Sequence, residues 1–231
     1  MSTIREQIIT ALVVRLGDIK TTAGYATNVG ANALRAVDVP AESQLDYVTA
    51  WPQPEEAIKK YGKTVCSMPV RVEAAALFGA TDPSVVIEQL LGDLIECLTG
   101  RQWSLSFSAG ATEIVVGQTV TGVGAQGYVA GITLATGTWA GGDAAGTLTL
   151  RRQTGSFGAG DLKVAGSKMA ETHGTATVQN PTALACGSLA DEIAYTAGGP
   201  ESWPAAGDLV CGVTAAFTIV YKTVIGNPFA Q

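Results

Sequence analysis

Two runs of alternating apolar and polar residues restrict the fold of this chain more than any other feature. The first covers residues 64–79 and the second covers residues 209–226, and both are longer than a typical strand. A period of two is typical of a β-strand that buries one face. The apolar positions are Cys66, Met68, Val70, Val72, Ala74, Ala76 and Phe78 in the first run, and Cys211, Val213, Ala215, Phe217, Ile219 and Tyr221 in the second. The sequence therefore predicts two long, half-buried strands. Because Pro69 has no N–H to donate, we expect the first strand to be an edge strand or to be bulged there.

Two other stretches have the helical period. Residues 2–16 place apolar side chains three and four positions apart, and Thr3 and Glu6 have the spacing of a capping box. In residues 81–100, Asp82 fits an N-cap, Pro83 the first helical position and Gly100 the end of the helix. Its acidic residues, Glu88, Asp93 and Glu96, are expected mostly on the solvent side. These patterns predict an α/β (α+β) fold in which two main helices pack on a mixed or antiparallel sheet.

The segment between the two long strands has a different character. Residues 102–180 contain short β-like runs separated by glycines, with no helical period. Such spacing is typical of a small all-β sandwich or barrel. After residue 180 the earlier pattern returns. We therefore expect a discontinuous α/β domain, residues 1–101 plus 181–231, interrupted by an inserted all-β domain, residues 102–180.

One motif in this segment has the spacing of a dinucleotide-binding loop. Gly122, Gly124 and Gly127 match G-x-G-x-x-G, which would suit an oxidoreductase that uses NAD or FAD. That chemistry requires a helix directly after the loop, so that the phosphates meet the helix N-terminus. The sequence that follows is strand-like and contains two more glycines. We therefore interpret the motif as a glycine-rich turn between short strands and expect no cofactor.

The charge distribution narrows the classes of partner. The formal net charge is −6, and the segment 102–180 carries four basic and four acidic side chains. The densest basic spot is Lys59, Lys60 and Lys63, which we interpret as a solvated turn before a strand. A chain without a basic run lacks the charge that phosphate-backbone recognition requires, so specific nucleic-acid binding is not expected as its main function.

The residues with catalytic or metal-binding chemistry are sparse. The four cysteines lie far apart in apolar stretches, which predicts buried free thiols, with a disulfide as the alternative, and no metal site. The single histidine, His173, is expected on the surface rather than in a catalytic group, and the adjacent carboxylates at 55–56 and 191–192 are expected to point apart. No stretch has the length of a membrane span, so we expect a protein made in the cytoplasm, with no membrane partner.

Three stretches, taken in order, resemble a known family. They are "MSTIREQIITALVVRL" at the start, "KKYGKTVCSMPVRVEAAALFG" followed by "DPSVVIEQLLGDLIECLTG", and "GGPESWPAAGDLVCGVTAAFTIVYKTVIGNPF" near the end. Together they resemble minor tail proteins of long-tailed bacteriophages, in particular the tail terminator or tail completion group. The stretch "ATGTWAGGDAAGTLTLRRQTGSFGAGDLKVAG" resembles the glycine-rich β-modules of phage tail and fibre proteins, which a plain terminator would lack.

The resemblance implies a structural role in the virion. A protein of this kind is a non-enzymatic subunit of a homo-oligomeric, hexameric ring at the head-proximal end of the tail tube. The ring ends tube polymerisation and joins the tail to the head. Its implied partners are the tail tube protein and the head–tail connector proteins, and DNA passes through it without specific binding. The implied location is the tail or neck of the virion, after assembly in the cytoplasm of the host bacterium.

A few residues are candidates for contact with partners. Trp203 with Pro204, and Phe229 with Pro228, place large aromatics in Gly/Pro-rich segments, where they either meet a neighbouring subunit or pack on their own. In the insert, Trp139 either fills the core or is an exposed aromatic that binds a surface. The second reading gives an alternative function: a different neck or minor tail protein whose β insert is a carbohydrate- or surface-binding module.

Overall fold

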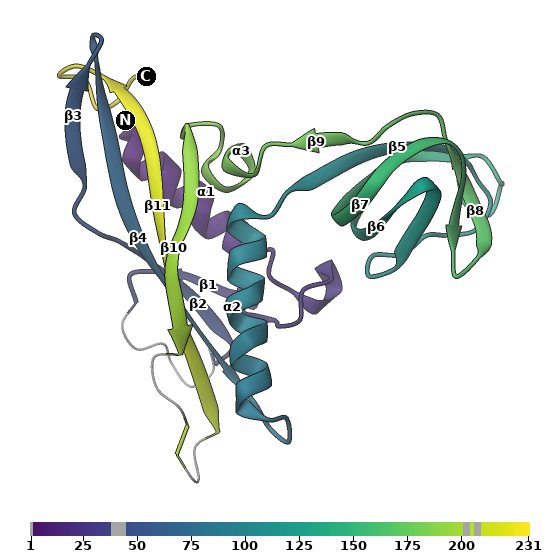
Figure 1. Cartoon of the computed structure of the whole chain (residues 1–231), viewed down its shortest axis with the longest axis horizontal. Helices are drawn as coiled ribbons and strands as arrows, with labels where there is room; N and C mark the ends of the chain where they lie inside the picture. The colour runs from purple at the N-terminus through teal and green to yellow at the C-terminus, as the bar shows by residue number, and fades with distance from the viewer. Residues whose placement is uncertain (1, 38–44, 201–203, 206–208) are drawn as a thin grey trace. The chain divides into compact units, whose positions relative to one another are not determined.

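The computed structural model describes residues 2–37, 45–200, 204–205 and 209–231. It divides the chain into two compact units, the first formed by Met1–Thr21, Tyr25–Gly100 and Pro181–Gln231, and the second by Thr22–Gly24 and Arg101–Asn180. Two sheets and three α-helices are present in the described residues, and strands predominate (Figure 1). The expectation of a mixed α and β fold is confirmed at this level.

The first unit contains one sheet and all three α-helices. The strand order is β1-β2-β4-β11-β10, and β3 also pairs with β4. Its helices and strands are α1 (Ile4–Leu16), the 3-10 turn η2 (Val29–Ala31), β1 (Asn32–Arg35), β2 (Tyr47–Pro52), β3 (Glu56–Lys60), β4 (Lys63–Leu77), α2 (Pro83–Thr99), α3 (Pro181–Cys186), β10 (Glu192–Pro200) and β11 (Val210–Val224). The 3-10 turn η1 (Thr21–Ala23) lies at the boundary between the two units.

The two long strands pair with each other along their whole length. β4 and β11 are antiparallel, from Lys63 opposite Val224 to Leu77 opposite Val210. Both alternate in burial as predicted, with Met68 and Phe217 among the fully buried side chains. Of the apolar positions predicted for the first strand, only Phe78 lies outside the observed strand, just past the end of β4. All four cysteines are buried and free, which confirms that prediction.

Pro69 does not mark an edge strand or a bulge. β4 is central, with β11 on one side and both β3 and β2 on the other. β3 pairs with β4 as far as Ser67, and β2 pairs with it from Val70 onward. Pro69 therefore lies at the gap between two successive neighbours, where no partner strand requires its missing N–H. Its carbonyl still accepts a hydrogen bond from the N–H of Gln53, at 2.9 Å. The prediction was wrong because one edge of β4 is shared by two short strands.

The two predicted helix starts are confirmed, but the prediction that Asp93 faces solvent was wrong. The Thr3 side chain accepts from the N–H of Glu6 at 3.1 Å, and Asp82 caps α2 by accepting from the N–H of Ser84 at 2.8 Å. Asp93, expected on the solvent side of α2, is only 2 % exposed. Its carboxylate accepts from the N–H of Ala26 at 3.1 Å and from the N–H and hydroxyl of Thr27, each at 2.8 Å. The polar pattern of the helix cannot reveal a buried carboxylate whose donors come from a distant loop.

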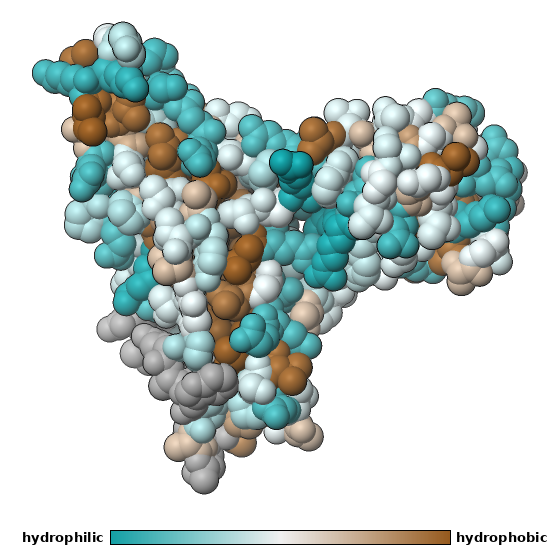
Figure 2. Space-filling view, in the orientation of Figure 1, coloured by the Kyte–Doolittle hydropathy of each residue, from teal (hydrophilic) through white to brown (hydrophobic). Residues whose placement is uncertain are grey.

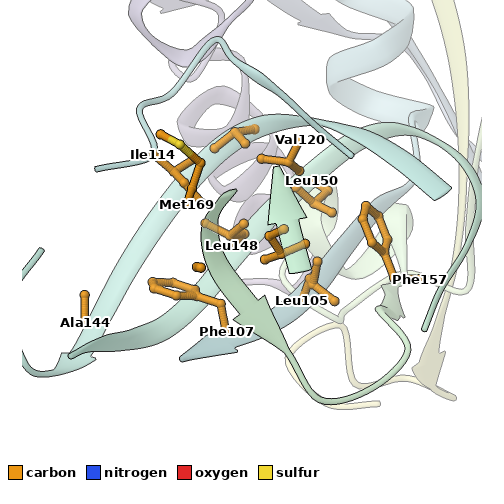
Figure 3. Close-up of a cluster of buried hydrophobic side chains, with 12 residues drawn as sticks. Leu105, Phe107, Ile114, Val120, Ala144, Leu148, Leu150, Phe157 and Met169 are labelled. Atoms are coloured by element: carbon orange, nitrogen blue, oxygen red, sulfur yellow. The ribbon is translucent and has the colours of Figure 1, made fainter. Parts of the chain in front are cut away.

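The second unit is a curled sheet. β7 pairs with β6, β5 and β8, and β5 also pairs with β8, so β5, β7 and β8 form a closed circuit of pairings. Figure 3 shows the buried apolar side chains that cluster in this unit. Leu148, Leu150 and Phe157 of β7 are fully buried in it. The strands are β5 (Gln102–Gly110), β6 (Thr119–Thr136), β7 (Ala144–Val164), β8 (Ser167–Thr172) and β9 (Thr177–Gln179).

The prediction of only short strands in this unit was wrong. β6 has 18 residues and β7 has 21, and their pairing is interrupted by several register shifts. Such bulges bend a strand without ending it. Gly122, Gly124 and Gly127 lie inside β6, so they form neither a turn between strands nor a loop that opens a helix. A Cβ at Gly122 would lie 2.7 Å from the buried ring of Phe157, so this glycine lets the ring pack directly on the backbone.

Candidate interaction surface

The most exposed large apolar side chain described in this protein is at the tip of a β-hairpin. Lys60 pairs with Lys63, so Tyr61 and Gly62 form the two-residue turn between β3 and β4. Both have positive φ, 49° and 77° respectively, as a type I′ turn requires. A positive φ is uncommon for a bulky residue such as tyrosine. This backbone conformation holds a side chain that is 94 % exposed away from the sheet.

Other apolar side chains gather at the same end of the sheet. Ile58 of β3 is 67 % exposed, and Ile225 and Phe229, which follow β11, are each 43 % exposed. β11 ends opposite the start of β4, which brings the C-terminal residues next to the hairpin. We call Ile58, Tyr61, Ile225 and Phe229, with Lys59, Lys60 and Lys63, the tip surface. Figure 2 shows apolar and hydrophilic residues side by side at this end of the first unit.

The C-terminal part of the tip surface is held by backbone hydrogen bonds. The N–H of Val224 donates to the carbonyl of Ala230 at 2.9 Å, and the N–H of Ile4 donates to the carbonyl of Pro228 at 2.9 Å. The N–H of Phe229 donates to the Asn227 side chain at 3.0 Å. The predicted contact residues Pro228 and Phe229 are thus both exposed in a turn anchored to α1. Predicted residue Pro204 is half-buried, and Trp203 lies outside the described residues.

The tip surface carries positive charge within an acidic protein. Lys59, Lys60 and Lys63 are exposed, and among the described residues none of them forms an ion pair, although the Lys60 ammonium lies 5.7 Å from the centre of the Tyr61 ring. Lys222, close by on β11, is neutralised by Asp191 at 2.8 Å. The solvated turn expected at these lysines is confirmed, and it is the tip of the hairpin formed by β3 and β4.

A pocket of about 520 Å³ lies beneath this end of the sheet. Tyr221 donates to the Glu55 carboxylate at 2.6 Å, and Arg5 lies 3.3 Å from the same oxygen of Glu55. Burial, followed by the hydrogen bond and charge of Glu55, raises the pKa of Tyr221 well above its usual range. Burial, reinforced by the Glu55 charge, also raises the pKa of the Cys66 thiol. A raised pKa favours the protonated thiol, which is a poor nucleophile.

Two other residues singled out by sequence lie in the second unit. The Trp139 ring stacks on Phe107, with centroids 5.2 Å apart and planes 5° apart, and it lies against Gly110, where a Cβ would approach it to 2.4 Å. These contacts account for Trp139 as a half-buried part of the core. His173 is exposed, as expected, and its Nε2 lies 2.5 Å from the Ser108 hydroxyl.

Within the described ranges, no group of three or more His, Cys, Asp or Glu side chains is arranged to hold a metal ion. A search of the same residues finds no helix with both the length and the apolar character needed to cross a membrane.

Sequence reasoning missed Tyr61 and Ile58 as surface residues. The pattern Lys-Lys-Tyr-Gly-Lys before an alternating run contains the signal, because a glycine at the second position of a two-residue turn favours a hairpin. With the turn placed at 61–62, residues 56–60 become a strand and their exposed side chains become visible. Comparison with known proteins adds no further assignment, since no protein-family model and no curated protein matches this chain.

Proposed function

We propose that this protein is a structural subunit of a phage tail or neck, similar to a tail terminator, that assembles into a ring of about six copies. The observation that carries the proposal is the tip surface, where four exposed apolar side chains gather at one end of the sheet with three lysines that form no ion pair with any described residue. An exposed apolar cluster is typical of a protein–protein contact site. The resemblance of the outer segments to tail terminator proteins supplies the kind of assembly.

The architecture of the first unit suits such a role. The fifteen paired positions of β4 and β11 span about 46 Å at roughly 3.3 Å per residue, so the tip surface lies far from the other end of the sheet. A closed ring uses heterologous contacts, in which two different faces of each subunit meet. A long sheet with different chemistry at its two ends provides two such faces.

The proposal includes a finer description of the fold and its partners. The first unit is a terminator-like domain with α1 and α2 as its main helices, and the β unit is a module inserted into it. The partners are the tail tube protein and the head–tail connector proteins. DNA passes through the ring without specific binding. The protein has no catalytic role, and its place is the tail or neck of the virion.

Locating the protein in assembled particles tests this function. Phage particles carrying a tagged copy, imaged by electron microscopy with a label for the tag, are expected to show one labelled ring at the head-proximal end of the tail. Label distributed along the tube, at the distal end or on the capsid surface would refute the terminator-like role. Particles without this protein are expected to contain tails of uncontrolled length that do not join heads.

A further inference from the structure

The end of the first unit opposite the tip surface also exposes apolar side chains. Leu77, at the end of β4, is 51 % exposed, Leu209, just before β11, is 66 % exposed, and Val85, in the first turn of α2, is 46 % exposed. The N–H of Phe78 donates to the carbonyl of Leu209 at 3.2 Å, so the chain segments that carry them are held together. We call these three residues, with Asp46, Asp82 and Glu88, the base surface.

The base surface carries the opposite charge to the tip surface. Asp82 and Glu88 are exposed and Asp46 is half-buried, and none of the three forms an ion pair with another described residue. Asp46 accepts from the N–H of Leu77 at 2.9 Å, and Asp82 caps α2, so both carboxylates are fixed in place. Hydrogen bonds from Ser84 hold the pKa of Asp82 below its ordinary value, which keeps it charged.

A pocket of about 300 Å³ opens in the base surface. Asp46, Thr27, Thr81 and Gln89 contribute polar groups to its wall, and Leu77 contributes an apolar side. The volume is at the lower limit of the roughly 300–1,000 Å³ typical of pockets that bind small ligands. A tyrosine side chain matches this lining, because its ring contacts the apolar side while its hydroxyl donates to a carboxylate or amide oxygen.

From these two ends we infer that the base surface of one copy receives the tip surface of a second copy, with Tyr61 entering the pocket beside Asp46 and the three lysines facing Asp82 and Glu88. Both surfaces combine exposed apolar residues with charge, and the charges are opposite. The contact is heterologous, because it uses different faces of the two copies, and repeated around an axis it closes a ring. The inference rests on the proposed ring assembly and names the surfaces that build it.

Charge-reversal variants test the contact. The tip-reversed variant combines Lys59→Glu, Lys60→Glu and Lys63→Glu, and the base-reversed variant combines Glu88→Lys and Gln89→Lys, which leaves the Asp82 cap and the Asp46 hydrogen bond in place. In the tip-reversed variant both surfaces are acidic, and in the base-reversed variant the base surface loses its net negative charge, so each variant alone is expected to associate at least about tenfold more weakly than the wild type by sedimentation velocity. In an equal mixture the tip lysines of the base-reversed copy meet the unchanged base surface of the tip-reversed copy, so the mixture is expected to associate more strongly than either variant alone. Lys163→Glu, an exposed reversal in the second unit, is the matched control and leaves association unchanged.

A second variant isolates the aromatic ring. Tyr61→Asn places a residue that favours positive φ at the same position of the turn, so the hairpin is retained while the ring is removed. The variant is expected to keep the wild-type circular dichroism spectrum and thermal midpoint but to lose at least about tenfold in association. Val178→Ser, an exposed apolar change in β9, is the control.

The outcomes separate the inference from the proposed function. Wild-type rings that persist in both reversed variants would overturn the inference and leave the ring proposal intact. Weakening in the tip-reversed variant alone, with a wild-type result for the base-reversed one, would overturn it in favour of a tip-to-tip contact. If mixing the two variants restores association but the wild type forms open chains instead of rings, the contact would be supported and the terminator-like ring contradicted. A wild type that stays monomeric at every concentration would overturn both.

Discussion

At the scale of single residues, Asp93 shows how one buried carboxylate ties a helix to a loop. It accepts three hydrogen bonds from Ala26 and Thr27, and its two oxygens are both used. A buried donor that loses its acceptor costs roughly 1–3 kcal/mol. The position of the 26–27 loop against α2 therefore depends on this side chain.

Replacing Asp93 with asparagine is expected to destabilise the first unit by about 1–3 kcal/mol, because the amide nitrogen cannot accept the hydrogen bonds made by one of the two oxygens. Hydrogen exchange of the α2 amides under native conditions measures the change. Glu88→Gln, on the exposed side of the same helix, is the control and is expected to have little effect. Equal protection in the two variants would contradict the role given to Asp93.

The same carboxylate makes stability depend on pH. Burial raises the pKa of Asp93 above its ordinary value of 3.8, against the lowering effect of its hydrogen bonds. The folded state thus binds this proton more tightly than the unfolded state, so the stabilisation is fully present below pH 3.8 and is lost as pH rises through the folded pKa. The difference in unfolding free energy between wild type and Asp93→Asn is expected to be larger at pH 4 than at pH 7. A difference that stays constant between these pH values would show that the pKa is not raised.

In the second unit, the packing of the core depends on a glycine, Gly122. Gly122→Ala is expected to destabilise that unit by about 1–3 kcal/mol, because the new methyl group meets the Phe157 ring at 2.7 Å and the ring is fully buried. Gly174→Ala is the matched control, since a Cβ there meets no atom within 4 Å. The stability of both variants is measured by denaturant unfolding and by native-state hydrogen exchange of the β6 and β7 amides. A harmless Gly122→Ala would mean that β6 does not pack on Phe157.

At the scale of elements, features that depend on residues close in sequence could be predicted, whereas features that depend on contacts between distant segments could not. The caps at Thr3 and Asp82 and the buried faces of β4 and β11 follow from residues close in sequence, and all of them are observed. Pro69 was misread because its surroundings depend on where β2 and β3 meet β4. The strands of the second unit were predicted to be short because glycine, taken as a sign of a turn, can also mark a bulge inside a continuous strand.

The helix α2 offers a stabilising substitution. Gly92 lies within α2 on its exposed side, and a Cβ there would meet nothing within 4 Å. Gly92→Ala is expected to stabilise the first unit by about 0.5–1 kcal/mol, because alanine loses less backbone entropy in a helix. Increased protection of α2 amides in hydrogen exchange would confirm it, while unchanged or reduced protection would contradict it.

At the scale of the whole molecule, the candidate site was only partly predictable. The C-terminal residues Pro228 and Phe229 were selected from sequence and do lie in the tip surface. Tyr61, Leu77 and Leu209 were not selected. Leu77 and Leu209 adjoin runs whose other apolar residues are mostly buried, and Tyr61 lies in a turn, so only the strand pairing shows that all three lie at the ends of the sheet. Likewise, the sequence does not show that the basic tip surface and the acidic base surface lie at opposite ends of the sheet, because this depends on how the strands pair.

The mass of the purified protein in solution tests the central claim most directly. The claim is that copies of this chain associate head to tail into a closed ring. Sedimentation equilibrium at increasing concentration and low ionic strength, where exposed charges are least screened, is expected to reach a limiting mass of about six times 23.6 kDa and to rise no further. A mass that remains at one copy throughout, or that grows without limit, would contradict it.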